Sequence, residues 1–135
     1  MPVGRRWLLV AACLLLAGCG TAEDAAISTV QDARSAVVVA QQAVRLRLDT
    51  RATTPYTQVV LDDSLDAVGA AEQELRDSSE PDRARTARAR VVLNDANTVL
   101  DELADAGADQ MSKADLDRLT ELVGRLDAAL AELRR

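Results

Sequence analysis

Cysteine has the most reactive side chain in this sequence, and the chain holds only two, Cys13 and Cys19. The thiolate form of cysteine is a nucleophile, so a cysteine in a distinctive setting is a candidate for covalent modification. Cys19 follows two small residues, Ala17 and Gly18, in the stretch LLLAGCG at residues 14–20. The residues before Cys19 therefore decide which chemistry its sulfur undergoes.

The first 18 residues have the three parts of a secretory signal peptide. Arg5 and Arg6 precede an apolar run at residues 7–16, and small residues follow it. A charged start, an apolar core of about 7–15 residues and a small-residue cleavage site are typical of such signals. Because a bilayer-spanning helix needs about 20 apolar residues, this run is too short to be one. We expect residues 1–18 to be removed during export.

The sequence Leu16-Ala17-Gly18-Cys19 resembles the lipobox of bacterial lipoproteins. In that family the cysteine sulfur receives a diacylglycerol, and cleavage falls just before the cysteine. The resemblance covers only about the first nineteen residues. It implies that Cys19 is the lipidation site, that membrane lipid is a partner, and that acyl chains such as palmitate hold the protein on the extracytoplasmic face of the cell membrane. The alternative is an ordinary signal peptide in which Cys13 and Cys19 are incidental apolar residues.

The composition of residues 19–135 excludes several function classes. These residues carry 14 basic and 22 acidic side chains, and the whole chain has no histidine. Histidine-ligated zinc, Glu-x-x-His di-iron sites and Ser-His-Asp triads are therefore impossible. An acidic chain with one lysine, and with Tyr56 as its only ring after the signal peptide, also lacks the features of a nucleic-acid binder. We expect no cofactor and no nucleic-acid partner.

Two acidic stretches resemble metal-binding motifs. Residues 62–66 read DDSLD and match the DDxxD motif with which isoprenoid synthases bind Mg²⁺ and diphosphate. The second acidic motif, the basic residues, the aromatic lining and the larger fold of those enzymes are missing. The run after Asp105 fails as an EF-hand, because Gln110 and Leu116 stand where glycine and glutamate are required. Solvated helix faces are expected at both stretches. A weak nonspecific cation site at the acidic end is the alternative for the second.

Arginines are densest at Arg83, Arg85, Arg88 and Arg90. At 100° per helical residue, Arg83 and Arg90 share one face while Arg85 and Arg88 share another. They do not form a single phosphate-binding stripe. We expect contacts between helices, with Glu74 near Arg85, and solvated faces. Binding of lipid headgroups or of an anionic wall polymer is the alternative.

Three apolar triplets begin at Val37, Val59 and Val91. Three consecutive helical residues sweep about 200°, which is wider than the apolar stripe of a surface helix. Each triplet must therefore lean a side chain away from the core. We expect these residues to flank the core, and an exposed strip that binds another helix is the functional alternative.

The elements that carry these residues are predicted to be helices. Helix-forming residues dominate, and apolar residues recur every three or four positions. Thr54-Pro55 and Ser112 with Asp115 are start signals, and Gly107 is a stop signal. The connections are short, which favours antiparallel neighbours. The sequence predicts an all-α, up-down-up-down four-helix bundle with helices near 22–51, 55–78, 81–106 and 113–134.

The expected domain organisation has three parts: the signal peptide at 1–18, a short tether at 19–21 that begins with lipidated Cys19, and the bundle at 22–135. If Thr21 caps the first helix, two extended residues hold the bundle about 7 Å from the anchor. With this topology, the half near the membrane has a net charge of −1 and the distal half −7.

The function expected from the sequence is that of a non-catalytic, lipid-anchored envelope protein. It would act as a membrane-proximal helical interaction or regulatory module, and its partner would be another membrane or envelope protein. The alternative is a carrier that holds an apolar ligand within the bundle. No enzyme activity is expected, since the best catalytic candidates, Asp62, Asp63 and Asp66, form no recognisable constellation.

Overall fold

The computed structural model describes residues 22–78 and 80–135 of the 135-residue chain. The signal peptide, Cys19 and Thr21 lie outside this part. The described part is helical and contains no strand. Its elements are the long helices α2 (Ala22–Leu48), α3 (Thr54–Arg76), α5 (Ala87–Ala106) and α6 (Lys113–Leu133), the short helix α4 (Glu80–Arg85), and the 3-10 turn η1 (Ala108–Gln110).

The predicted start and stop signals lie at or next to the observed helix ends. Ser112 and Asp115 form a capping box, in which the Asp115 N–H donates to Ser112 Oγ at 3.3 Å and the Ser112 N–H donates to the Asp115 carboxylate at 2.9 Å. Gly107 ends α5 with a φ of +88°, a conformation that favours glycine. The cap of α3 is one residue earlier than predicted, since Thr53 Oγ1 accepts the hydrogen bond from the Tyr56 N–H.

The first helix ends three residues before its predicted end at residue 51. The Thr50 N–H donates to the Arg47 carbonyl at 3.1 Å, and the Arg51 N–H donates to the Leu46 carbonyl at 2.8 Å. These two bonds form a Schellman motif. Thr50 occupies its left-handed position with a φ of +58°, where glycine or asparagine is usual. The sequence offers no glycine to mark this end, which explains the missed boundary.

The predicted third helix, 81–106, is instead two helices separated at Thr86. Thr86 has a φ of −90° and a ψ of 2°, and its residue is only 1% exposed. Its carbonyl accepts from the Arg90 N–H at 2.9 Å and so begins the first turn of α5. No side-chain hydrogen bond of Thr86 caps α5, so the break shows as a change in backbone angles at a buried residue.

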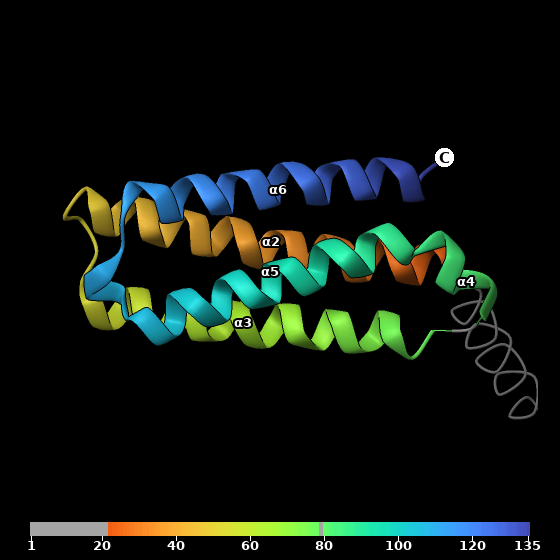
Figure 1. Cartoon of the computed structure of the whole chain (residues 1–135), viewed down its shortest axis with the longest axis horizontal. Helices are drawn as coiled ribbons and strands as arrows, with labels where there is room; N and C mark the ends of the chain where they lie inside the picture. Colours follow the sequence, from red (N-terminus) through yellow and green to blue (C-terminus); the bar gives the residue numbers. More distant parts are fainter. Residues whose placement is uncertain (1–21, 79) are drawn as a thin grey trace, which may run out of the picture.

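The four long helices lie side by side (Figure 1). The α2–α3 and α5–α6 connections are at one end of the molecule, and α4 and the C-terminus are at the other. Helix α2 packs against α3 and α6, and α5 also packs against α3 and α6. We call the interface between two packed helices a seam. The α2–α3 seam and the α5–α6 seam therefore have no helix in common.

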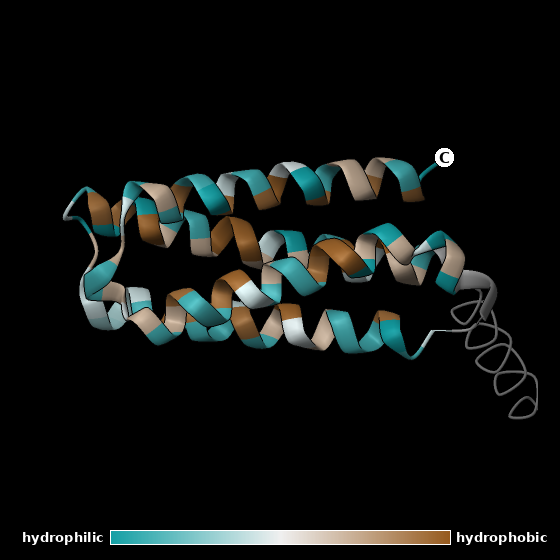
Figure 2. Cartoon of the chain, in the orientation of Figure 1, coloured by the Kyte–Doolittle hydropathy of each residue, from teal (hydrophilic) through white to brown (hydrophobic). Residues whose placement is uncertain are grey.

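The core is built from small and β-branched residues on α2 and mainly from leucines on the other long helices. Figure 2 shows apolar and polar residues alternating along each helix. This pattern confirms the predicted amphipathic spacing. Fully buried core residues include Val30, Val37 and Val44 of α2, Leu61 of α3, Leu93 and Leu100 of α5, and Leu119 and Leu126 of α6. Each such side chain contributes about 1.5–3 kcal/mol through burial.

Candidate functional site

The DDxxD-like residues lie on the solvent-exposed side of α3. Asp62, Asp63 and Asp66 are all exposed, and Asp62 accepts a hydrogen bond from Gln58 Nε2 at 3.2 Å. Across residues 22–78 and 80–135, no group of three acidic or cysteine side chains is placed to hold a metal ion. The aspartates therefore do not converge into a site for a hard cation.

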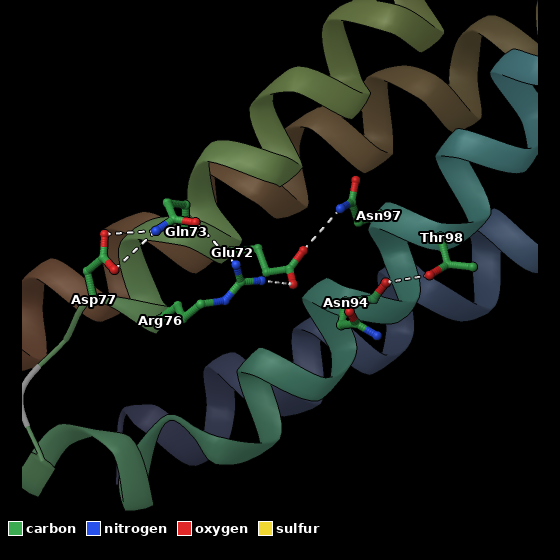
Figure 3. Close-up of polar contacts among 7 residues, drawn as sticks. All are labelled: Glu72, Gln73, Arg76, Asp77, Asn94, Asn97 and Thr98. Atoms are coloured by element: carbon green, nitrogen blue, oxygen red, sulfur yellow. Dashed lines mark hydrogen bonds and ion pairs between the residues drawn. The ribbon is translucent and has the colours of Figure 1, made fainter.

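A buried carboxylate that the sequence reasoning missed lies between α3 and α5 (Figure 3). Glu72 is only 8% exposed. Its Oε1 accepts from Arg76 Nη2 at 2.7 Å, and its Oε2 accepts from Asn97 Nδ2 at 3.1 Å. Two features of the sequence could have indicated it. Glu72 precedes Arg76 by four residues, and its helical spacing from the buried residues Val68 and Leu75 places it on the same face of α3. Because both oxygens have partners, Glu72 acts as a clamp between helices and is not positioned as a free base.

Two arginines of the basic cluster, Arg85 and Arg88, contact α6, which differs from the expected contact with α3. Arg83 donates to the Ser78 carbonyl and Arg90 to the Arg83 carbonyl, both at 3.3 Å. Arg85 donates to the Leu133 carbonyl, and Arg88 donates to the Glu132 carboxylate at 3.1 Å. The predicted contact between Arg85 and Glu74 does not form. The expectation of contacts between helices is confirmed, but it placed the wrong neighbour beside these arginines because Thr86 redirects the chain before α5 begins.

Further ion pairs join α6 to its two neighbours. On the α5 side, Arg125 pairs with Asp95 at 2.5 Å and Arg118 pairs with Glu102 at 2.5 Å. On the α2 side, Arg34 pairs with Asp127. The hydrogen bond that Arg34 donates to the Asp127 carboxylate raises the pKa of the Arg34 guanidinium. Burial opposes this rise, and the negative charge of Asp127 adds to it.

The triplets expose one valine each, as the width of their helical sweep predicted. Val37 is fully buried while Val39 is 50% exposed, and Leu61 is fully buried while Val59 is 57% exposed. Val91 is 59% exposed on α5. Val39 and Val59 lie on α2 and α3, whose seam carries the apolar groove described next.

The groove between α2 and α3 has a volume of about 270 Å³. Its lining comes from both helices: Ser35, Ala36 and Val39 of α2, and Val60, Asp63 and Ser64 of α3. Small side chains form much of this lining, and the two valines flank them. Tyr56 is 53% exposed and precedes Val60 by four residues, so it lies one helical turn away on the same side of α3. Asp63 is the one charged residue in the lining of this groove.

Comparison of the chain with protein-family models, with curated proteins and with solved structures gives no match. Among residues 22–78 and 80–135, no helix is both long and apolar enough to cross a bilayer.

Proposed function

We propose that this chain is a lipid-anchored protein of the extracytoplasmic face of the cell membrane. It acts as a non-catalytic, membrane-proximal helical interaction or regulatory module. Membrane lipid is one partner, reached through acylated Cys19, and another membrane or envelope protein is the second. The lipobox-like residues 16–19 support the anchor. Two or more acyl chains would make that anchoring stable.

The observation that carries the interaction role is the apolar groove between α2 and α3, which is lined by the exposed Val39 and by Val60, with the exposed Tyr56 one helical turn away on α3. Large apolar side chains gathered on one surface are typical of sites that bind other proteins. The clamp at Glu72 and the ion pairs of α6 use their polar groups within the molecule, which favours a binding role over a catalytic one.

We also propose an antiparallel, up-down-up-down bundle for the four long helices. Short connections and the neighbour pairs of α2 and α5 support this topology. It places the start of α2 at the same end as α4 and the C-terminus, so the anchored end would be the nearly neutral one. The more acidic end would face away from anionic lipid.

The anchor is tested by expressing the full chain in a bacterium with lipoprotein export and comparing Cys19→Ala with Cys13→Ala. We expect the Cys13→Ala protein to be cleaved and to stay in the membrane fraction, with diacylglycerol on residue 19 in the mass of its N-terminal peptide. The Cys19→Ala protein should leave the membrane fraction. Equal membrane retention of the two variants would refute the anchor.

The carrier alternative has its own test, native mass spectrometry of the gently purified full chain. Bound mass beyond the N-terminal acyl chains would favour a carrier. A mass equal to that of the acylated polypeptide alone would favour the interaction module.

A further inference from the structure

The solvent edge of the α2–α3 seam differs from the edges that α6 forms. No hydrogen bond or ion pair between side chains joins Ala25–Leu48 of α2 to α3. Val39 and Val60 line the groove at this edge. The exposed Tyr56 lies one helical turn before Val60, and the exposed Val59 lies next to Val60 but outside the groove lining. We call these residues, with Ala36 and Asp63, the α2–α3 face. It is held together by apolar packing and is left partly uncovered.

The charge on this face has one sign. Between Thr54 and Leu75, α3 contains five acidic residues and no arginine or lysine. Glu72 is paired with Arg76, but Asp63, which lines the groove, and Glu74 have no ion-pair partner within the described part of the chain. Asp66 is also unpaired, but it lies on the other side of α3, in a hollow toward α5. The only basic residue of α2 before Arg45 is Arg34, which pairs with Asp127 on the opposite side of α2, toward α6. An exposed apolar strip is therefore bordered by carboxylates whose charge is uncompensated.

This charge pattern selects among the possible occupants. A second copy placed face to face would bring Asp63 and its neighbours toward like charges, which is unfavourable. An anionic bilayer surface would be repelled for the same reason. A helix with an apolar ridge bordered by arginine or lysine would cover the exposed valines and would also pair its positive charges with the carboxylates. Such a helix uses the ordinary helix-in-groove mode, with anchors at positions i, i+3, i+4 and i+7.

We infer that the α2–α3 face binds an amphipathic helix of a partner protein, with its apolar ridge against Val39 and Val60 and a basic residue against Asp63. This inference rests on the proposed interaction role and names the chemistry of the partner. The small residues Ser35, Ala36 and Ser64 in the groove allow the backbone of that helix to approach closely.

Site-specific photocrosslinking of the full chain in intact cells tests this inference. A photoreactive amino acid replaces Val59 in one strain and Val91 in another. The two valines form a matched pair, since they are 57% and 59% exposed and lie on α3 and α5, respectively. We expect the Val59 probe to crosslink a partner and the Val91 probe to crosslink little. Mass spectrometry of the crosslinked peptide should identify a segment with an apolar helical ridge flanked by arginine or lysine.

Charge reversal provides the second measurement. In the strain with the Val59 probe, Asp63→Arg should reduce the crosslink yield about fivefold, because attraction becomes repulsion. Asp117→Arg is the matched control. It makes the same change in net charge at an exposed position of α6 and should leave the yield unchanged. Circular dichroism of both variants verifies that each one folds.

Equal crosslinking from both positions, or equal effects of the two charge reversals, would overturn the inference. So would a Val59 crosslink to a segment without basic residues, to a second copy of this chain, or to lipid alone. A protein partner captured only from Val91 would overturn the inference and keep the proposed interaction role. Capture of no protein from either position would count against both.

Discussion

The interface between α2 and α3 and the interface between α5 and α6 share no helix, and both bury apolar residues, but they differ at their solvent-exposed edges. Ion pairs cross the α5–α6 seam, including Arg125–Asp95 and Arg118–Glu102. Exposed valines and unpaired aspartates border the α2–α3 seam. The α5–α6 edge exposes charged side chains to solvent, while the α2–α3 edge exposes apolar side chains.

This difference concerns recognition more than stability. Exposed ion pairs typically contribute about 0–1 kcal/mol each, so the α5–α6 edge gains little free energy of folding from them. Burial of leucine and valine supplies most of the stability of both seams. The bare edge of the α2–α3 seam therefore costs the fold little and leaves a surface for a partner.

The largest expected effect tests whether the two seams have equal apolar cores. Leu61→Ala in α3 and Leu126→Ala in α6 each remove a fully buried side chain. Each should lower the free energy of unfolding by about 2–5 kcal/mol, because the substitution loses burial and leaves a cavity. Urea unfolding followed by far-ultraviolet circular dichroism measures this loss. A much smaller loss for Leu61→Ala would mean that the α2–α3 seam is loosely packed, and the comparison would fail.

The next effect concerns the buried clamp between α3 and α5, the contact that joins one seam to the other. Asn97→Ala removes the donor to Glu72 Oε2 and should cost about 1–3 kcal/mol, since a mostly buried carboxylate oxygen loses its partner. The same unfolding experiment measures the cost.

Asn94→Ala is the control for the clamp. Asn94 is exposed, and Figure 3 shows it on the same helix with its carbonyl bonded to Thr98. Its side chain makes no hydrogen bond to Glu72, so the substitution should change the free energy of unfolding by less than about 0.5 kcal/mol. Equal losses for the two asparagines would show that helix propensity, and not the contact with Glu72, causes the effect.

A smaller effect is expected at the polar edge itself. A double-mutant cycle with Arg125→Met and Asp95→Asn should give a coupling energy of about 0.2–1 kcal/mol, because both side chains are partly exposed. The coupling should fall further in 1 M salt, where screening is effective beyond about 3 Å. A coupling of several kcal/mol that resists salt would show that this edge stabilises the fold, contrary to the comparison.

Much of the fold was predictable from the spacing of apolar residues. The long helices followed from repeats of three and four, and the caps at Ser112 and Gly107 followed from local chemistry. The break at Thr86 and the left-handed Thr50 were missed, because each depends on chain reversal and burial that a linear pattern does not encode.

The candidate surface was only half predictable. The width of the triplets predicted that one side chain of each turns away from the core, with residues that flank the core as the expectation and an exposed strip as the alternative; Val39, Val59 and Val91 are each at least half exposed. The sequence did not reveal that Val39 lies beside Val60 across one groove, because this depends on how α2 and α3 are rotated about their axes. The same reason explains why the pairing of Glu72 with Asn97 was missed.

The smallest expected effect isolates recognition from folding. Val59→Ala and Val91→Ala should each change the free energy of unfolding by less than about 0.5 kcal/mol, because both side chains are more than half exposed. The higher helix propensity of alanine offsets part of any lost contact. If Val59 serves a partner, Val59→Ala should weaken the contact of the α2–α3 face with that partner, whereas Val91→Ala should not. If Val59→Ala alone lowered the free energy of unfolding by more than about 1 kcal/mol, the Val59 side chain would contribute to the packing of this chain. Its exposure would then be no evidence for a binding surface on α3.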